Sequence, residues 1–176
     1  MIERVIIAGS GGQGIMLIGK ILAQAAMREG KFVTWLPAYG AEVRGGTAHC
    51  MVVISDSEIG SPRIEKAETI IIMNQLSLAK FKSRLKNNGL LIINSSLAKV
   101  SAGVKAIKHP FTDIAIALGN VKVANMVALG CYLGNKKTVA LKNILSIIKE
   151  IAPADKKGLI QVNQKALHRG VELRNG

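Results

Sequence analysis

Six residues near the N-terminus have the types and spacing of a phosphate-binding turn. Residues 9–14 read Gly-Ser-Gly-Gly-Gln-Gly, which satisfies the pattern G-x-G-x-x-G, and they follow the apolar run 5–7. In dinucleotide-binding proteins the first glycine makes a tight turn, the second lets the backbone approach a pyrophosphate, and the third permits close helix–strand contact. A helix that begins here would add free N–H groups and partial positive charge. This glycine turn could bind a dinucleotide, bind another phosphorylated or carboxylated ligand, or serve packing alone.

The residues after the glycine turn argue against a nicotinamide dinucleotide. Such a site needs an Asp or Glu at the end of the second strand, about 20 residues further on, to bind the ribose 2′-OH. We expect that strand over residues 31–36, and neither it nor residues 37–39 contains an acid or an arginine. The first acid is Glu42. An NAD(P)-dependent dehydrogenase domain is therefore kept only as an alternative.

A second loop, residues 37–46, supplies the other candidate residues. Its Arg44 carries a planar guanidinium group suited to a carboxylate or a phosphate, and it precedes a pair of glycines. Glu42 lies two residues earlier and could neutralise Arg44, so an internal tether that shapes the loop is the alternative. Loops that follow consecutive parallel strands emerge at the same sheet edge. We therefore expect this arginine loop to lie beside the glycine turn.

The elements that position both loops follow from hydrophobic periodicity. We expect strands at 4–8, 31–36, 47–55, 69–73 and 90–94, with a short strand around 104–107. We expect helices at 13–29, 75–86, 121–133, 138–151 and 158–173, the last of them exposed. Gly30 should end the first helix, the turn 87–89 the second, and Thr138 should cap the fourth.

This order predicts a three-layer α/β/α fold with a mainly parallel, Rossmann-like sheet and helices on both faces. A chain of 176 residues, 49% of them hydrophobic, fits one domain, here 1–176 with a helical C-terminal third over about 121–176. The segment 121–133 is apolar nearly all round. It should be buried, either in the core or against a partner subunit.

The net charge of +13 is unevenly distributed. Residues 1–60 carry five basic and five acidic side chains, whereas residues 61–135 carry ten and three, and residues 136–176 nine and three. The excess is typical of a lysine-rich solvated surface or of a site for an acidic protein. A basic nucleic-acid-binding protein is a further alternative, but aromatic residues make up only 3% of the chain, too few for base-stacking platforms.

Other chemistry is sparse. Cys50 and Cys131 are isolated in apolar surroundings, so we expect reduced, buried thiols in a cytoplasmic protein and no iron–sulfur cluster on this chain. The three histidines lack the spacing of a metal site, and no nucleophile–base set is evident, so neither a catalytic residue nor a metal ligand is assigned. We expect neither a secretion signal nor a membrane span.

Taken together, the two loops resemble the gamma subunit of 2-oxoacid:ferredoxin oxidoreductases. The resemblance covers about residues 3–135. The segments that carry it are GSGGQGI (9–15), LPAYGAEVRGGTAHCMVVISDSEIGSP (36–62), ETIIIMNQ (68–75), GLLIINSS (89–96) and VANMVALG (123–130). Within the family, Ser10 and the wording around Tyr39 are most similar to the 2-oxoglutarate or branched-chain oxoacid enzymes, whereas pyruvate-type subunits tend to have Arg at the position of Ser10.

The resemblance implies a subunit that supports thiamine-dependent oxidative decarboxylation of a 2-oxoacid, with formation of an acyl-CoA and electron transfer to ferredoxin. Thiamine diphosphate and iron–sulfur clusters would belong to the partner alpha, beta and ferredoxin-like delta subunits. The implied ligand of this chain is coenzyme A, with no nucleic acid and no membrane among its partners. The carried-over binding residues are Gly9, Gly11, Gly12, Gln13 and Gly14 in the glycine turn, and Tyr39, Gly40, Glu42, Arg44, Gly45 and Gly46 in the arginine loop.

Overall fold

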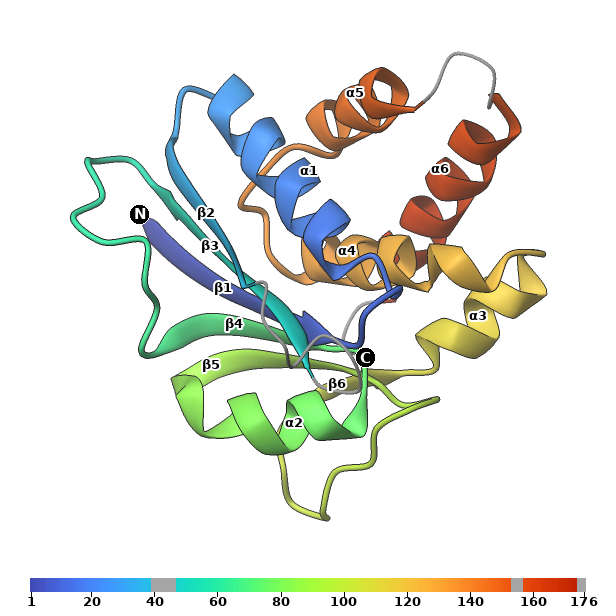
Figure 1. Ribbon diagram of the computed structural model, residues 1–176, viewed down its shortest axis with the longest axis horizontal. Coiled ribbons are helices and arrows are strands. Elements are labelled where there is room, and N and C mark those ends of the chain that lie inside the picture. The colour runs from blue at the N-terminus through green and yellow to red at the C-terminus, as the bar shows by residue number, and fades with distance from the viewer. Residues whose placement is uncertain (39–46, 153–156, 174–176) are drawn as a thin grey trace.

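A six-stranded mixed sheet carries the fold of the computed structural model, which describes residues 1–38, 47–152 and 157–173 (Figure 1). The strand order is β2-β3-β1-β4-β5-β6. The strands are β1 (Ile2–Gly9), β2 (Phe32–Ala38), β3 (Ala48–Ser55), β4 (Ala67–Ile72), β5 (Leu85–Asn94) and β6 (Ile107–His109). Three neighbouring pairs, β1–β4, β4–β5 and β5–β6, are parallel, as the sequence predicts for most of the sheet.

The strand β3 separates β1 from β2, the first two strands along the chain, which α1 connects. It lies between β1 and β2 and is antiparallel to both, so β1 and β2 run in the same direction without pairing. Their carboxyl ends still share one edge, because Gly9 faces Ala48 and Ala38 faces His49 across the ladders. Ala38 and Ala48, on either side of residues 39–46, are thereby placed at the same sheet edge as Gly9, where the glycine turn starts.

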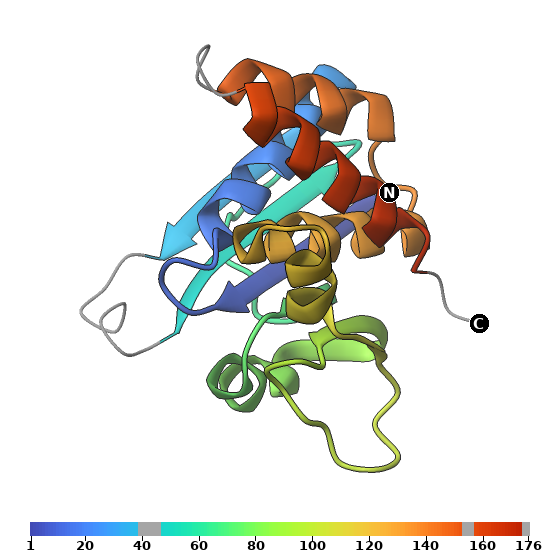
Figure 2. The same cartoon turned by 90° about the vertical axis from the view of Figure 1, so that its right-hand side faces the viewer.

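Helices cover both faces of the sheet, as predicted. One face carries α1 (Ile15–Arg28), α3 (Phe111–Ala117), α4 (Ala124–Asn135), α5 (Leu141–Ile151) and α6 (Lys157–Val171) (Figures 1 and 2). The other face carries α2 (Gln75–Phe81), which buries Leu78 and Phe81 against β1, β4 and β5. Short 3-10 turns, η2 (Lys82–Arg84) and η3 (Val121–Val123), precede β5 and α4. None of the described helices is long and apolar enough to cross a bilayer.

The structure corrects two local predictions and adds one helix. The helix expected over 75–86 ends at Phe81, because β5 begins at Leu85 and absorbs the predicted turn 87–89 as an irregularity with Asn88 at φ 64°. The short strand expected around 104–107 is displaced to β6, at Ile107–His109. The helix α3 was not predicted, since its seven residues are too few to show a period.

The C-terminal helices also differ from expectation. The helix α6 is not simply exposed: Ala166, Leu167 and Gly170 are buried against α4. Thr138 does not cap α5 but is buried, and its hydroxyl lies 2.8 Å from the Tyr132 hydroxyl. The start of α5 is held by Glu29, whose carboxylate accepts from the Ala140 N–H and the Asn143 amide at 2.7 Å each.

The predicted apolar helix corresponds to η3 and α4, and its burial is internal. Every residue from Ala124 to Leu133 is buried by contacts within this chain. The core alternative is therefore the one observed. A helix that is apolar all round is stable here because α1, α3, α6 and β5 pack around it.

Candidate functional site at the carboxyl edge of the sheet

The glycine turn joins β1 to α1 at the carboxyl edge. Gly14 is the N-cap residue of α1 with φ 70°, and Gly12 has φ 84°, so both lie in the left-handed region that favours glycine. A Cβ added to Gly12 would meet no atom within 4 Å, so the backbone there faces open space. A Cβ added to Gly14 would lie 2.1 Å from Nδ2 of Asn125. The absence of a side chain at Gly14 thus lets α4 pack against the turn, whereas the open space at Gly12 leaves room for a ligand.

The helix–strand contact of a dinucleotide fold is made by a different glycine. A Cβ on Gly19, one turn into α1, would lie 2.4 Å from Sγ of Cys50 and 3.1 Å from Nε1 of Trp35. Gly19, not Gly14, therefore brings α1 close to the sheet. The third glycine of the motif has a role here that the dinucleotide pattern does not assign to it, and this weakens the NAD interpretation further.

Hydrogen bonds from three elements hold the turn in shape. Oε1 of Gln13 accepts from the Ser10 N–H at 2.7 Å, and the Gln13 N–H donates to the Ser10 carbonyl at 3.3 Å. Asn74, which follows β4, donates to the Ser10 hydroxyl. The hydroxyl of Ser77 in α2 donates to the Gly9 carbonyl at 3.3 Å. The Gln13 side chain, predicted as a ligand contact, is used to brace the turn.

Three asparagines around the turn were missed by sequence reasoning. Asn74 follows β4 and caps α2 by accepting from the Ser77 N–H at 2.9 Å. Asn94 ends β5 and donates to the Met73 carbonyl at 3.3 Å, and Asn125 on α4 donates to the Gly14 carbonyl at 3.3 Å. A usable signal was present in the sequence, because Asn74 and Asn94 each end an apolar strand run. These side chains stabilise the backbone of the carboxyl edge.

A cavity of about 390 Å³ opens directly against the turn and the first residues of α1. Its lining is mostly apolar and consists of Ser10, Gly11, Gly12, Gly14, Ile15, Met16, Leu17 and Ala48. Ala48 begins β3 just after the arginine loop, so this cavity lies where the two loops were expected to meet. The first N–H groups of a helix have no intrahelical partner, which gives the cavity donors for an anion at one end.

Of the predicted binding residues, the structure therefore groups Gly11, Gly12 and Gly14 around one cavity. Gly9 ends β1, and a Cβ there would meet Oε1 of Gln13 at 2.5 Å. The other six predicted residues lie outside the described part of the chain: Tyr39, Gly40, Glu42, Arg44, Gly45 and Gly46.

Neither cysteine of this chain offers a reactive thiol. Burial raises the pKa of Cys50 and of Cys131 to about 12, and both are free and buried, as predicted. At neutral pH each thiol is protonated, and a protonated thiol does not attack an acyl or disulfide group. Within residues 1–38, 47–152 and 157–173, no group of three His, Cys, Asp or Glu side chains is placed to hold a metal ion.

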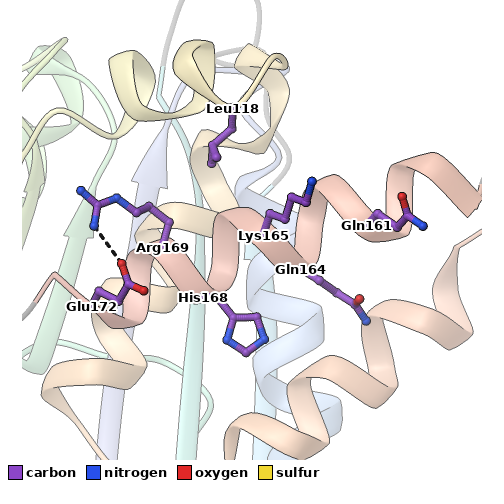
Figure 3. Close-up of a pocket in the computed structure, with 7 residues that line it drawn as sticks. All are labelled: Leu118, Gln161, Gln164, Lys165, His168, Arg169 and Glu172. Atoms are coloured by element: carbon purple, nitrogen blue, oxygen red, sulfur yellow. Dashed lines mark hydrogen bonds and ion pairs between the residues drawn. The ribbon is translucent and has the colours of Figure 1, made fainter.

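A larger cavity, about 680 Å³, lies along α6 and shares no lining residue with the one at the turn. Figure 3 shows its residues along one side of α6, with Leu118 facing them from the end of α3. Its charged groups include Arg169, which forms an ion pair with Glu172 at 2.8 Å. Six of its seven lining residues carry polar or charged side chains, and these six lie beyond the first turn of α6.

Residues 4–173 match the family described as pyruvate ferredoxin/flavodoxin oxidoreductase. Ketoisovalerate oxidoreductase subunit VorA of Methanothermobacter thermautotrophicus is 38% identical over 96% of this chain, which spans only 36% of that relative. The 2-oxoglutarate synthase subunit KorC of Archaeoglobus fulgidus is 34% identical over 95% of this chain and 85% of its own length.

Two solved structures have the same fold. The keto/oxoacid ferredoxin oxidoreductase gamma subunit of Geobacter sulfurreducens is 28% identical with a TM-score of 0.84, covering 97% of each chain. The 2-oxoglutarate:ferredoxin oxidoreductase of Magnetococcus marinus, solved with 2-oxoglutarate, coenzyme A and succinyl-CoA, is 21% identical with a TM-score of 0.87. This chain is covered to 98% in that comparison and spans 31% of the larger chain.

Proposed function

The chain belongs to the pyruvate ferredoxin/flavodoxin oxidoreductase family, and on that premise we propose that it is the gamma subunit of a 2-oxoacid:ferredoxin oxidoreductase. The observation that carries this proposal is the family match over residues 4–173, a range that includes both the glycine turn and the arginine loop. In the proposed reaction a 2-oxoacid and coenzyme A become an acyl-CoA and CO₂, and the electrons pass to ferredoxin.

The proposed role of this chain is to hold coenzyme A. Coenzyme A combines phosphates with an apolar, amide-containing arm. The open backbone at Gly12 and the first N–H groups of α1 suit a phosphate, and the cavity side formed by Ile15, Met16 and Leu17 suits the arm. Arg44 in the adjacent loop would add a guanidinium fork for a second anionic group.

The remaining chemistry is assigned to partner subunits. Thiamine diphosphate, when bound there, would supply decarboxylation, and iron–sulfur clusters would supply electron transfer, on the alpha, beta and ferredoxin-like delta subunits. This chain would contribute the orientation of coenzyme A. We place the complex in the cytoplasm.

We propose 2-oxoglutarate as the first substrate to test. Support comes from Ser10 and the sequence of the arginine loop, and from the name of a relative, the 2-oxoglutarate synthase subunit KorC, which this chain matches over 95% of its own length and 85% of the relative's. The 38% identity to a ketoisovalerate oxidoreductase subunit makes a branched-chain oxoacid the second candidate.

Reconstitution tests the proposal. We expect the purified chain alone to give no turnover, and the chain mixed with its partner subunits to reduce ferredoxin only when both a 2-oxoacid and coenzyme A are present. Omitting this chain from the mixture is the control. Full turnover by the isolated chain, or tight binding of a nicotinamide cofactor to it, would contradict the assignment.

A further inference from the structure

A charged cavity lies at the edge of the sheet where the parallel strands begin, opposite the edge that carries the glycine turn. A cavity of about 430 Å³ there is lined by Arg4, Ser61, Arg63, Glu65, Lys66 and Lys86. Arg4 stands in β1, Lys86 in β5, and the residues numbered in the sixties precede β4. We call the five cations Arg4, Arg63, Lys66, Arg84 and Lys86 the basic edge. It is separated from the glycine turn by the length of β1.

Two of these cations are held in place by neutral partners. Nζ of Lys66 donates to the Ser83 carbonyl at 2.6 Å, and Nε of Arg84 donates to the Glu65 carbonyl at 3.3 Å. The Arg84 guanidinium also lies 5.8 Å from the centre of the Phe81 ring. A carbonyl or a ring orients a cation but does not cancel its charge. These side chains are therefore pre-ordered, which lowers the entropy that a partner must supply on binding.

Internal carboxylates neutralise only part of the basic edge. Glu68 serves two cations at once, since it pairs with Arg4 at 3.0 Å and also with Lys86. The other nearby carboxylate, Glu65, is exposed, and within the described part of the chain it forms no ion pair. Arg63 is exposed too, and among residues 1–38, 47–152 and 157–173 its one hydrogen bond is from its backbone N–H to the Ser61 hydroxyl, at 3.2 Å. Five cations thus face two carboxylates.

We propose that the basic edge docks an acidic protein surface, with carboxylates of the partner pairing with Arg63, Lys66 and Arg84. Exposed cations bind a single small anion weakly because solvent and salt screen the charge. A protein surface presents several carboxylates together and excludes water from them, which strengthens each pair. Phe81, the ring that the Arg84 guanidinium lies against, is 1% exposed and cannot stack on a nucleic-acid base.

Fluorescence titration with a labelled decaglutamate peptide tests this proposal on the full chain. We expect binding that weakens as salt is raised, and Arg63→Glu combined with Lys66→Glu should weaken it by about tenfold or more. The matched control reverses two exposed lysines on α5, Lys142→Glu with Lys149→Glu, and should change the affinity less than about twofold. Thermal melting of both variants, with Arg63→Gln/Lys66→Gln as a milder pair, checks that folding is retained.

The proposal is overturned if the double change at Arg63 and Lys66 leaves the affinity for the peptide unaffected, or if the α5 control loses as much affinity. It is also overturned if a ten-nucleotide oligonucleotide binds more tightly than the peptide and loses affinity on the same double change. These results are independent of the coenzyme A site, because the substituted residues lie at the other edge of the sheet.

Discussion

Replacing Gly14 by alanine is expected to lower the free energy of unfolding by about 3 kcal/mol. Two costs add. A residue with a Cβ is strained at φ 70°, and the new methyl group would lie 2.1 Å from Nδ2 of Asn125. Asn125 is 3% exposed and donates to the Gly14 carbonyl while its Oδ1 accepts from the Met126 N–H, so it has little room to move.

Gly12→Ala is the matched control, because Gly12 shares the left-handed backbone but faces open space. It should cost about 1 kcal/mol from strain alone. Urea denaturation of both variants measures the difference. Equal losses at the two positions would show that the contact between the turn and α4 contributes nothing to stability.

Gly130→Ala should be at least as destabilising, by about 3 kcal/mol, through the packing of α4 on α6. A Cβ at Gly130 would lie 2.1 Å from the Leu167 carbonyl oxygen and 2.9 Å from Cα of Gly170. Figure 2 shows α4 and α6 side by side. Both obstacles are backbone atoms, so the helices themselves must separate, and the buried residues between them would lose contact.

Gly158→Ala provides a control of opposite sign. Gly158 lies in the first turn of α6 with no atom within 4 Å of an added Cβ, so alanine should stabilise the helix by up to about 1 kcal/mol. Thermal or urea unfolding of the two variants gives the comparison. A neutral Gly130→Ala would mean that α4 and α6 are not packed at this distance.

Local patterns in the sequence predict much of the fold. The apolar runs give β1, β3 and β4, and the 3.6-residue period gives α1, whose end at Gly30 is confirmed by the N–H of Lys31 donating to Ala26. These features depend on residues within one turn or one strand. The layers and the class of sheet follow from their order.

Features that depend on distant residues could not be predicted in this way. The insertion of β3 between β1 and β2 leaves no trace in hydrophobicity, because an apolar run specifies a strand but not its direction. Glu29 caps α5 although it lies more than one hundred residues earlier in the sequence. The local pattern could not show this contact and predicted Thr138 as the cap instead. The close contact at Gly130 likewise depends on a helix that appeared exposed from its own composition.

In the candidate site too, features that depend on local sequence were predicted and features that depend on distant residues were not. The glycine turn was located from its spacing alone, and its position beside the ends of the arginine loop follows from strand direction. The individual roles of Gln13 and Gly14 were not accessible, because Gln13 bonds to the Met73 carbonyl and Gly14 packs against Asn125, and both partners are distant in sequence.

The Michaelis constant for coenzyme A of the reconstituted complex tests most directly whether the two loops form its binding site. Arg44→Ala should raise this constant by about tenfold, the value of one charge-assisted pair. Arg169→Ala, which removes an exposed arginine of α6, should leave it unchanged. If Arg44→Ala instead leaves the constant unchanged and alters only assembly or thermal stability, Arg44 is structural and the proposed coenzyme A site is wrong.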